Sequence, residues 1–407
     1  MLIERYLGLN YLLTEDPHLH HPESTVSINY SLEAKEGFFN IYQDPLLIQE
    51  DIKQQDIIVS REKSSSVTSP EIGFFFKTNG VYDLPFDLFS AAFYLLTRYE
   101  EYLPHEKDAH GRYKSSNSIL SNKAFNFLPI VEIWMDDFKK RLKKLHPQLL
   151  FKEPTFQYIP TIDIDNAFKY MGRNWLKKPP NILNKQCCSV LMGRAEDPYN
   201  TVLSMIDQLE KFGQEPILFF LLSDQHQHDS NVQPTSKKLQ ALIQSLQKNK
   251  LGIHPSYLAT KNNKIQQQKQ QLEYLYPEIT QSRQHFLRIN FPDYFNQLIE
   301  AGIKIDYSLA YPDVQGFRAG YSKPFPFYDL EKNCPTSLIL QPSCWMDATY
   351  EYYNHLSEQE VKEEFSLFFS QLKKINANLV TIFHNDLFAT NKHRSIFNYI
   401  HQKINSQ

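Results

Sequence analysis

Glycine is scarce in this chain, with 12 glycines among 407 residues, about half the share of an average protein. None of them forms a GxGxxG or GxxxxGK pattern. The dinucleotide fingerprint and the phosphate-binding loop both depend on glycines at those spacings. The sequence therefore argues against the common nucleotide-dependent enzymes.

Cysteine is also rare, with 4 residues, two of them adjacent at Cys187 and Cys188. Such a set is too small and too badly spaced for a disulfide framework. No CxxC pair occurs, which excludes a structural zinc ribbon.

Neither an excess of one charge nor a long apolar run is present. The 43 Lys+Arg and 46 Asp+Glu residues leave a net charge of −3, which predicts no nucleic-acid partner. No run of 18 apolar residues occurs, so we expect no membrane span. Charges and the polar Asn10 interrupt the first residues, unlike a secretory signal. We therefore expect a cytoplasmic protein.

In residues 1–150 the apolar and polar runs follow no regular strand–helix alternation, which predicts a smaller α+β N-terminal domain. A largely apolar run over 86–101 indicates a buried helix. A second helix is expected after Pro129, ending near the basic cluster at 139–141. The charged cluster 98–101 has three readings: a site, a solvated helix end or a contact between domains.

From residue 155 to 407, short β-rich runs alternate with helix-length segments of helical period. One of these helices opens with the capping box Ser357-x-x-Glu360, and another stops at Gly302. This alternation predicts parallel βαβ units in an α/β fold, a distorted (β/α)7 barrel. The seven predicted strands are 157–165, 215–223, 250–257, 282–288, 303–311, 337–346 and 378–385.

Reactive side chains follow most of these strands, at the end where such barrels build their active sites. Asp163 and Asp165 are two apart, so they share one face of the first strand. Two carboxylates that close repel unless a cation or a proton lies between them. Each residue taken alone also has an ordinary structural reading. The remaining strand ends carry His254, Arg283, His285, Asp306 and His384.

This ordered series resembles the polysaccharide deacetylase family, carbohydrate esterase family four, over about residues 155–405. Members of that family remove N- or O-acetyl groups from sugars. The segment 161–165 resembles the motif Thr-Phe-Asp-Asp-Gly with Ile164 inserted, and 283–286 resembles Arg-x-Pro-Tyr/Phe with His285 in place of proline. The other matches are His254 to His-Ser/Thr-x-x-His, 306–308 to Asp-x-x-Asp/Ser-Trp, and 382–384 to Leu-x-His. The N-terminal part resembles the uncharacterised domain that precedes such barrels in some Bacteroidetes proteins, in its Phe86-Asp87, 98–101 and 111–113 segments.

The resemblance implies a divalent metal, with zinc expected, and it departs from the family at one ligand. Leu258 stands where the family has its second metal-binding histidine. We expect Asp165 and His254 to bind the metal, with His285 as the third ligand. A zinc site needs about three protein ligands and an open position.

The remaining roles are carried over from the family. The expected reaction is hydrolysis of a carbon–nitrogen bond other than a peptide, removing an acetyl group from an N-acetylated sugar or polysaccharide intermediate. Asp163 is the expected base, held by Arg283, although Ile164 leaves open a swap of the two aspartates or joint binding of metal. His384 is the expected acid, oriented by Asp306. The expected substrate contacts are Tyr257, Tyr311 and Arg318.

Two rival functions remain open. A barrel that has lost catalysis could bind a glycan or a partner protein, and the missing family histidine favours that reading. A retaining glycosidase could use Asp163 and Asp165 without metal, since it needs two carboxyls ~5–5.5 Å apart. That reading assigns no role to His254 or His384.

Overall fold

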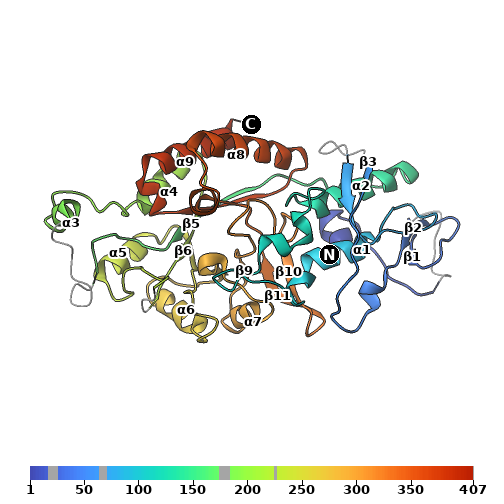
Figure 1. Cartoon of the computed structure of the whole chain (residues 1–407), viewed down its shortest axis with the longest axis horizontal. Helices are drawn as coiled ribbons and strands as arrows, with labels where there is room; N and C mark the ends of the chain where they lie inside the picture. The colour runs from blue at the N-terminus through green and yellow to red at the C-terminus, as the bar shows by residue number, and fades with distance from the viewer. Residues whose placement is uncertain (17–25, 64–70, 174–183, 224–226, 407) are drawn as a thin grey trace.

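The computed structural model describes the whole chain apart from residues 17–25, 64–70, 174–183, 224–226 and 407. The molecule is elongated, with the N-terminal region at one end and the barrel at the other (Figure 1). Among the described residues, no helix has the length and apolar character needed to cross a membrane.

The N-terminal region is a small α+β unit, as expected. The apolar run begins helix α1 where Asp87 accepts hydrogen bonds from the backbone N–H groups of Phe89 and Ser90. The helix ends earlier than predicted because Arg98 adopts a left-handed backbone (φ 54°). The described elements are the parallel pair β1 (Ile28–Ser31) and β2 (Phe39–Tyr42), the hairpin β3 (Ser60–Lys63) and β4 (Glu71–Phe74), α1 (Leu88–Leu96) and α2 (Ile130–Leu145).

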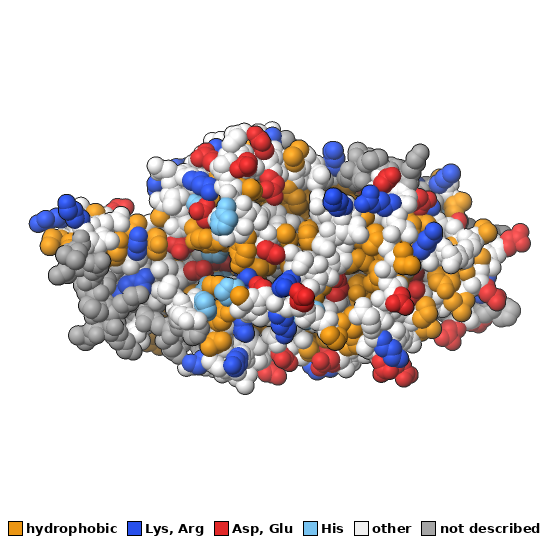
Figure 2. Space-filling model, in the orientation of Figure 1, with side chains coloured by type: hydrophobic (Ala, Val, Ile, Leu, Met, Phe, Trp, Pro, Cys, Tyr) orange, Lys and Arg blue, Asp and Glu red, His pale blue; other side chains and the backbone are white. Residues whose placement is uncertain are grey.

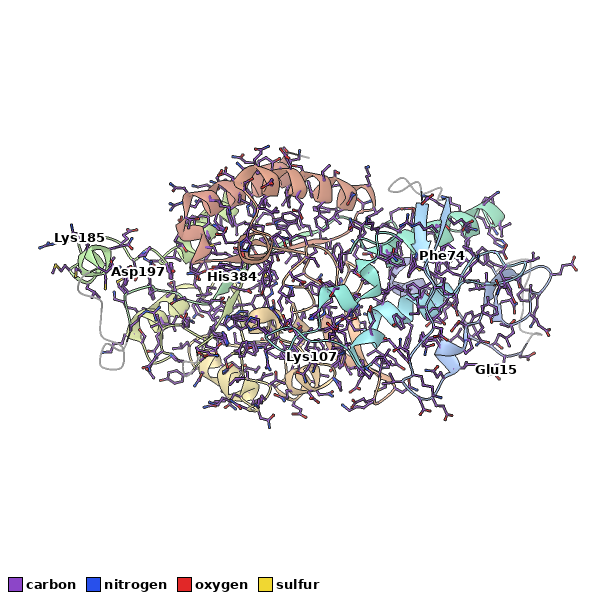
Figure 3. All side chains as sticks on the ribbon, viewed as in Figure 1. Glu15, Phe74, Lys107, Lys185, Asp197 and His384 are labelled. Carbon is purple, nitrogen blue, oxygen red and sulfur yellow. The ribbon has the colours of Figure 1, made fainter. Side chains whose placement is uncertain are left out.

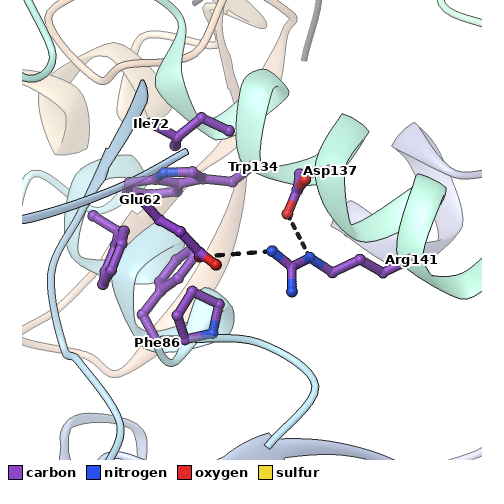
Figure 4. A pocket seen from close by; sticks show the side chains of 8 residues that line it. Glu62, Ile72, Phe86, Trp134, Asp137 and Arg141 are labelled. Carbon is purple, nitrogen blue, oxygen red and sulfur yellow. Dashed lines mark hydrogen bonds and ion pairs between the residues drawn. The ribbon is translucent and has the colours of Figure 1, made fainter. Parts of the chain in front are cut away.

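A pocket in this region lies against α2, and none of the predicted site residues lines it (Figure 4). Arg141 spans its mouth, paired with Asp137 at 2.7 Å and with Glu62 at 3.6 Å. Trp134 and Phe86 pack in its wall, 5.2 Å apart. These contacts tie the hairpin to α2, so we interpret the pocket as a packing feature.

The C-terminal part is built on one mainly parallel sheet. Its strand order in the described residues is β10-β11-β9-β8-β7-β6-β5-β13-β12. These strands are β5 (Tyr158–Ile164), β6 (Ile217–Phe220), β7 (Lys250–Ile253), β8 (Gln281–Ser282), β9 (Ile305–Asp306), β10 (Phe325–Asp329), β11 (Cys334–Leu340), β12 (Trp345–Met346) and β13 (Leu379–His384). Among the described strands of this sheet, β10 alone pairs antiparallel, with β11.

The sheet closes through a single segment of chain. β11 pairs with β9 on one side, and β12, which follows it after a short link, pairs with β13 on the other. The predicted distorted (β/α)7 barrel is thus confirmed, with β11 and β12 together filling the sixth position. Burial on both faces explains the continuous apolar run of β6.

Helices cover the barrel on both sides, α8 and α9 above and α6 and α7 below as drawn (Figure 1). The capping box at Ser357 and Glu360 forms as predicted and begins α8. Gly302 has φ 73° directly after α7, the left-handed turn expected there. The described helices of this part are α3 (Lys185–Leu191), α4 (Val202–Glu210), α5 (Lys237–Ser245), α6 (Ile265–Glu273), α7 (Asp293–Glu300), α8 (Glu358–Lys374) and α9 (Asn391–Asn405).

The N-terminal region and the barrel share one hydrophobic core, which runs from Tyr6 to Ile404. They join along residues 311–322, between β9 and β10. There the backbone N–H of Phe317 donates to the carbonyl of Phe127. Gly316 permits this approach, because a Cβ at that position would lie 2.6 Å from the carbonyl oxygen of Phe127.

Candidate metal centre

The predicted reactive side chains meet at the carboxyl ends of the parallel strands. Asp163 and Asp165 lie at the end of β5, His254 follows β7, and His384 is the last residue of β13. His285 lies in a short turn after β8, because that strand ends at Ser282 and is much shorter than predicted. Figure 2 shows histidine and carboxylate side chains gathered in a hollow over this part of the barrel, and Figure 3 labels His384 there.

Asp165, His254 and His285 form a group that could hold a metal ion. One potential ligand atom from each lies within 4.8 Å of the others. His254 Nε2 is 3.1 Å from Asp165 Oδ1, and His285 Nε2 is 3.2 Å from Asp165 Oδ2. The structure therefore brings together the three residues expected to bind metal.

Groups behind the two imidazoles hold them in one orientation. Nδ1 of His254 lies 2.6 Å from the carbonyl oxygen of Arg283, a group that can only accept. Nδ1 of His285 lies 2.8 Å from Asp229 Oδ1. Each Nδ1 therefore donates outward, so that a ring without a proton on Nε2 directs that lone pair at Asp165. Carbonyl and carboxylate partners of this kind orient metal-binding histidines in proteins.

This arrangement passes a chemical test for a cation site. When both rings are neutral, two nitrogen lone pairs face the two oxygens of Asp165, so four acceptors converge. Asp165 Oδ1 and His254 Nε2 are buried without a hydrogen-bond partner among the described residues. Such atoms are costly to bury unless a cation or a proton lies between them. Two imidazoles and one carboxylate are a donor set that suits zinc.

The close approach of carboxylates and imidazoles also shifts the pKa values of the cluster. Burial alone would raise the pKa of Asp165, but the adjacent His285, His254 and His384 outweigh it and hold that pKa well below the ordinary value. Burial works against protonation of His285, yet Asp165 and Asp229 raise its pKa to about 9. The site thus attracts positive charge strongly.

Asp163 lies beside this cluster and is paired with Arg283. Arg283 Nη1 donates to Asp163 Oδ1 at 2.8 Å and to the Thr161 hydroxyl at 2.6 Å. The guanidinium is fully buried and lies over the ring of Phe219, 4.6 Å from its centre. Asp163 Oδ2 faces the site, 3.8 Å from His254 Nε2 and 4.0 Å from His384 Nε2.

His384 lies opposite Asp163 and is oriented by Asp347. Its Nδ1 lies 2.5 Å from Asp347 Oδ1, and its backbone N–H donates to Asp347 Oδ2 at 2.7 Å. Nε2 points into the site, 3.9 Å from Asp165 Oδ2. Burial opposes protonation of the ring, but Asp347, Asp165 and Asp163 raise the pKa of His384 well above its ordinary value.

The expectation that Asp306 orients His384 is wrong. Asp347 already occupies His384 Nδ1, whereas Asp306 Oδ2 accepts from the hydroxyls of Tyr294 and Ser308, both at 2.8 Å. Burial raises the pKa of Asp306 to about 6. Asp306 therefore belongs to a buried polar network beneath the site.

Two of the three expected substrate contacts are also wrong. Arg318 is fully buried and pairs with Glu101, and the Tyr311 hydroxyl accepts from Arg98 Nη2 at 3.0 Å. Both side chains join the barrel to the N-terminal region, which is the third reading given above for the cluster at 98–101. Tyr257 alone lies beside the metal cluster, where its backbone N–H donates to Asp229 Oδ1 at 3.0 Å.

Sequence reasoning missed Asp347 and Asp229. Asp347 directly follows β12, so the strand-end rule that selected the other residues would have found it. Asp229 lies several residues beyond the end of β6, and no spacing in the sequence marks it.

Comparison with known proteins gives different matches for the two parts of the chain. Residues 1–147 match the model of a family of unknown function, DUF7033. No curated protein matches the chain. The C-terminal part is similar in fold to polysaccharide deacetylases, a mixed α/β barrel with a mainly parallel sheet, here carrying a histidine–aspartate cluster that could bind metal.

Three of the similar solved structures illustrate this likeness. A protein from Mycobacterium smegmatis, assigned as a polysaccharide deacetylase, has 13% identity and a TM-score of 0.43, covering 63% of this chain and 86% of that chain. The allantoinase Puue has 10% identity and a TM-score of 0.41, covering 62% and 85%. A protein from Pseudomonas aeruginosa, also assigned as a polysaccharide deacetylase, has 9% identity and a TM-score of 0.40, covering 62% and 86%.

Proposed function

We propose that this protein is a metal-dependent hydrolase that removes an acetyl group from an N-acetylated sugar or a polysaccharide intermediate. The observation that carries the proposal is the cluster of Asp165, His254 and His285, flanked by the Asp163–Arg283 and His384–Asp347 pairs. The motif order supports the sugar substrate, because it resembles that of the polysaccharide deacetylases. In this proposal His285 is the third ligand. It takes the place of the family histidine whose absence favoured a purely binding function.

Asp163 is suited to act as the general base. Arg283 occupies Oδ1 and orients the carboxylate, while Oδ2 faces the site. An oxygen held in this way can take a proton from a water molecule that attacks the acetyl carbonyl. The inserted Ile164 does not prevent the division of roles, because Asp163 contacts Arg283 and Asp165 faces both imidazoles.

His384 is suited to act as the general acid. Asp347 holds its Nδ1 and stabilises the imidazolium, so that Nε2 carries a proton toward the site. Donation of this proton to the departing amine nitrogen completes cleavage of the carbon–nitrogen bond.

The proposed cofactor is a zinc ion held by Asp165, His254 and His285. When bound there, it polarises the acetyl carbonyl and lowers the pKa of a water molecule. The chain's own groups then move the protons, with Asp163 as acceptor and His384 as donor on neighbouring strands, 4.0 Å apart.

Metal analysis combined with an acetate assay tests this proposal. We expect the purified protein to hold zinc and to release acetate from an N-acetylglucosamine oligomer. Treatment with EDTA should abolish this release and added zinc should restore it. His285→Ala should lose zinc and activity together. His401→Gln, which changes a buried barrel histidine outside the cluster, should keep both. Acetate release that survives complete chelation, or unchanged zinc in His285→Ala, contradicts the proposal.

A further inference from the structure

A loop of the N-terminal region lies directly on the mouth of the barrel, beside the metal cluster. Arg288, from the turn after β8, donates through Nε to the carbonyl oxygen of His110 at 2.8 Å. In the other direction, Arg112 Nη1 donates to the carbonyl oxygen of Phe286 at 2.9 Å, and its Nη2 donates to the Tyr353 hydroxyl at 2.9 Å. Three contacts thus fix this loop to two segments of the barrel.

The loop has a defined shape of its own. Lys107 and Tyr113 form an antiparallel bridge across its base. Asp108 Oδ1 accepts from the backbone N–H groups of His110 and Arg112, both at 2.9 Å. Asp108 also pairs with the Arg112 guanidinium at 2.7 Å, which is nearly fully buried. A buried guanidinium that bonds both its own loop and the barrel indicates a fixed position for His110.

The side chain of His110 completes a cluster of four rings. The other members are His228, Tyr257 and Phe286, all from the barrel. Every pair in this ring cluster is in contact, with centroids between 4.4 and 5.8 Å apart. His110 Nδ1 lies 3.1 Å from the Tyr257 hydroxyl. His110, His228 and Phe286 are partly exposed, so the ring cluster presents part of its surface to solvent.

The ring cluster adjoins the metal cluster directly. The Phe286 ring lies 4.7 Å from the ring of His285, its neighbour in sequence. The Tyr257 backbone N–H donates to Asp229 Oδ1, the same oxygen that contacts His285 Nδ1. A group held at Asp165 and His285 would therefore have the ring cluster beside it.

We propose that the ring cluster is the sugar-binding wall of the site and that His110 is the contribution of the N-terminal region to substrate recognition. This inference rests on the proposed function and names the part of the chain that selects its substrate. Flat rings bind the apolar face of a pyranose, and polar atoms at ring edges bind its hydroxyls, the usual make-up of a small-molecule site. A contact that served only to hold the two parts of the chain together would not need two partly exposed imidazoles. The N-terminal region would then act as part of the site.

Three variants test this inference. His110→Ala removes the ring, His110→Phe keeps a flat ring, and His110→Gln keeps a polar side chain without one. His105→Ala is the matched control, since His105 packs on Tyr113 near the base of the same loop. The measurements are kcat and KM for acetate release from tetra-N-acetylchitotetraose, its Kd for the zinc-loaded protein, zinc content and Tm.

We expect His110→Ala and His110→Gln to raise KM and Kd about 10-fold, as loss of ~1.4 kcal/mol of binding predicts, with kcat and zinc content nearly unchanged. His110→Phe and His105→Ala should keep KM close to the wild-type value. If His110→Ala fails to fold, the comparison of His110→Gln with His110→Phe decides.

Unchanged KM and Kd in His110→Gln overturn the inference. A lower Tm and kcat with the same Kd also overturn it, because they indicate a structural role alone. A wild-type protein that binds the oligomer but releases no acetate contradicts the proposed function only, and Kd then still tests His110. A wild-type protein without affinity for the oligomer overturns the inference.

Discussion

Each reactive side chain of the site has one atom held from behind and one atom directed inward. The Arg283 carbonyl holds His254, Asp229 holds His285 and Asp347 holds His384. The inward atoms converge on Asp165. Such support fixes ring orientation before any ligand binds, which is a condition for metal selectivity and for efficient catalysis. Single substitutions should therefore separate metal binding from chemistry.

Asp163→Asn and Asp165→Asn should have different effects. Asp163→Asn keeps its shape beside Arg283 and lies outside the metal cluster, so we expect normal zinc content and a kcat about 10²–10⁴-fold lower. Asp165→Asn replaces the carboxylate that faces both imidazoles, and should lose zinc as well as activity. Zinc content and acetate release of both variants check this. If both keep full zinc and activity, the assigned roles are wrong.

Asp347→Asn tests the support behind His384. The amide is nearly isosteric but removes the negative charge that stabilises the imidazolium. We expect kcat to fall by about 10²-fold or more, with zinc content and KM little changed, because Asp347 acts through His384. Asp306→Asn is the comparison, since Asp306 contacts Tyr294 and Ser308 and not His384. A larger loss of kcat in Asp306→Asn, with stability unchanged, would reverse this assignment.

Site residues could be predicted from the sequence where they lie at the end of a predicted strand. Asp163, Asp165, His254 and His384 all lie at strand ends, and their order along the chain was sufficient to identify them as site residues. Tyr311 was misread because its hydroxyl meets an arginine 213 residues away. No local pattern reports such a contact.

At the scale of elements, helices were easier to predict than strands. α8 begins at its capping box and α7 ends at Gly302, both local signals. β8 has two residues in the structure, and beyond it the chain turns, with Phe286 and Leu287 at φ 60° and 51°. The β-rich composition of that run reflects burial at the barrel mouth, which composition alone does not distinguish from a strand.

The packing of α9 on the barrel predicts an acid-sensitive contact. His401 is fully buried, with Nε2 2.7 Å from the Tyr158 hydroxyl and Nδ1 2.6 Å from the Phe397 carbonyl oxygen. Burial lowers the pKa of His401 to about 4. In the unfolded chain the pKa of His401 is ~6.5, so the unfolded chain takes up a proton more readily than the folded one. The free energy of unfolding is therefore fully present above pH ~6.5 and falls as the pH falls toward 4.

We expect the free energy of unfolding to fall by about 2 kcal/mol because of His401 when the pH is lowered from 7.5 to 5. Urea denaturation of the wild type and His401→Gln at both pH values measures it. The variant, which cannot titrate there, should show a smaller drop by that amount. Equal drops in the two proteins would mean that His401 is not the titrating group.

At the scale of the molecule, the charged segment after α1 is a contact between the two parts. Its interdomain reading could be stated from sequence, but its partner could not, because Arg318 lies 217 residues from Glu101. The same limit applies to the loop at 107–113, whose sequence does not show that it reaches the barrel mouth. Pairings at this separation depend on how the barrel closes, which is a property of the whole chain.

Glu101 is the group on which this contact depends. It pairs with Arg98 at 2.9 Å and with Arg318 at 2.5 Å, and all three side chains are buried. Burial would raise the pKa of Glu101, but the two arginines outweigh it and lower that pKa. Glu101→Gln leaves two buried guanidinium groups with Glu100 as the nearby carboxylate, 3.8 Å from Arg98. Loss of one partner from a buried pair costs about 3–5 kcal/mol.

We therefore expect Glu101→Gln to lower the denaturation midpoint strongly. Glu106→Gln, which changes an exposed carboxylate paired with Lys114, should leave the midpoint nearly unchanged. Replacement of these three buried charges by Arg98→Met, Glu101→Leu and Arg318→Met should recover part of the loss, because neither guanidinium is then left without Glu101. Glu100 loses Arg98 in this variant but still accepts from the hydroxyls of Tyr113 and Ser118. Since the N-terminal region and the barrel share one core, tryptophan fluorescence and circular dichroism should report the same shifted transition. Separate transitions for the two probes, or equal midpoints for Glu101→Gln and Glu106→Gln, would show that this cluster does not hold the two parts together.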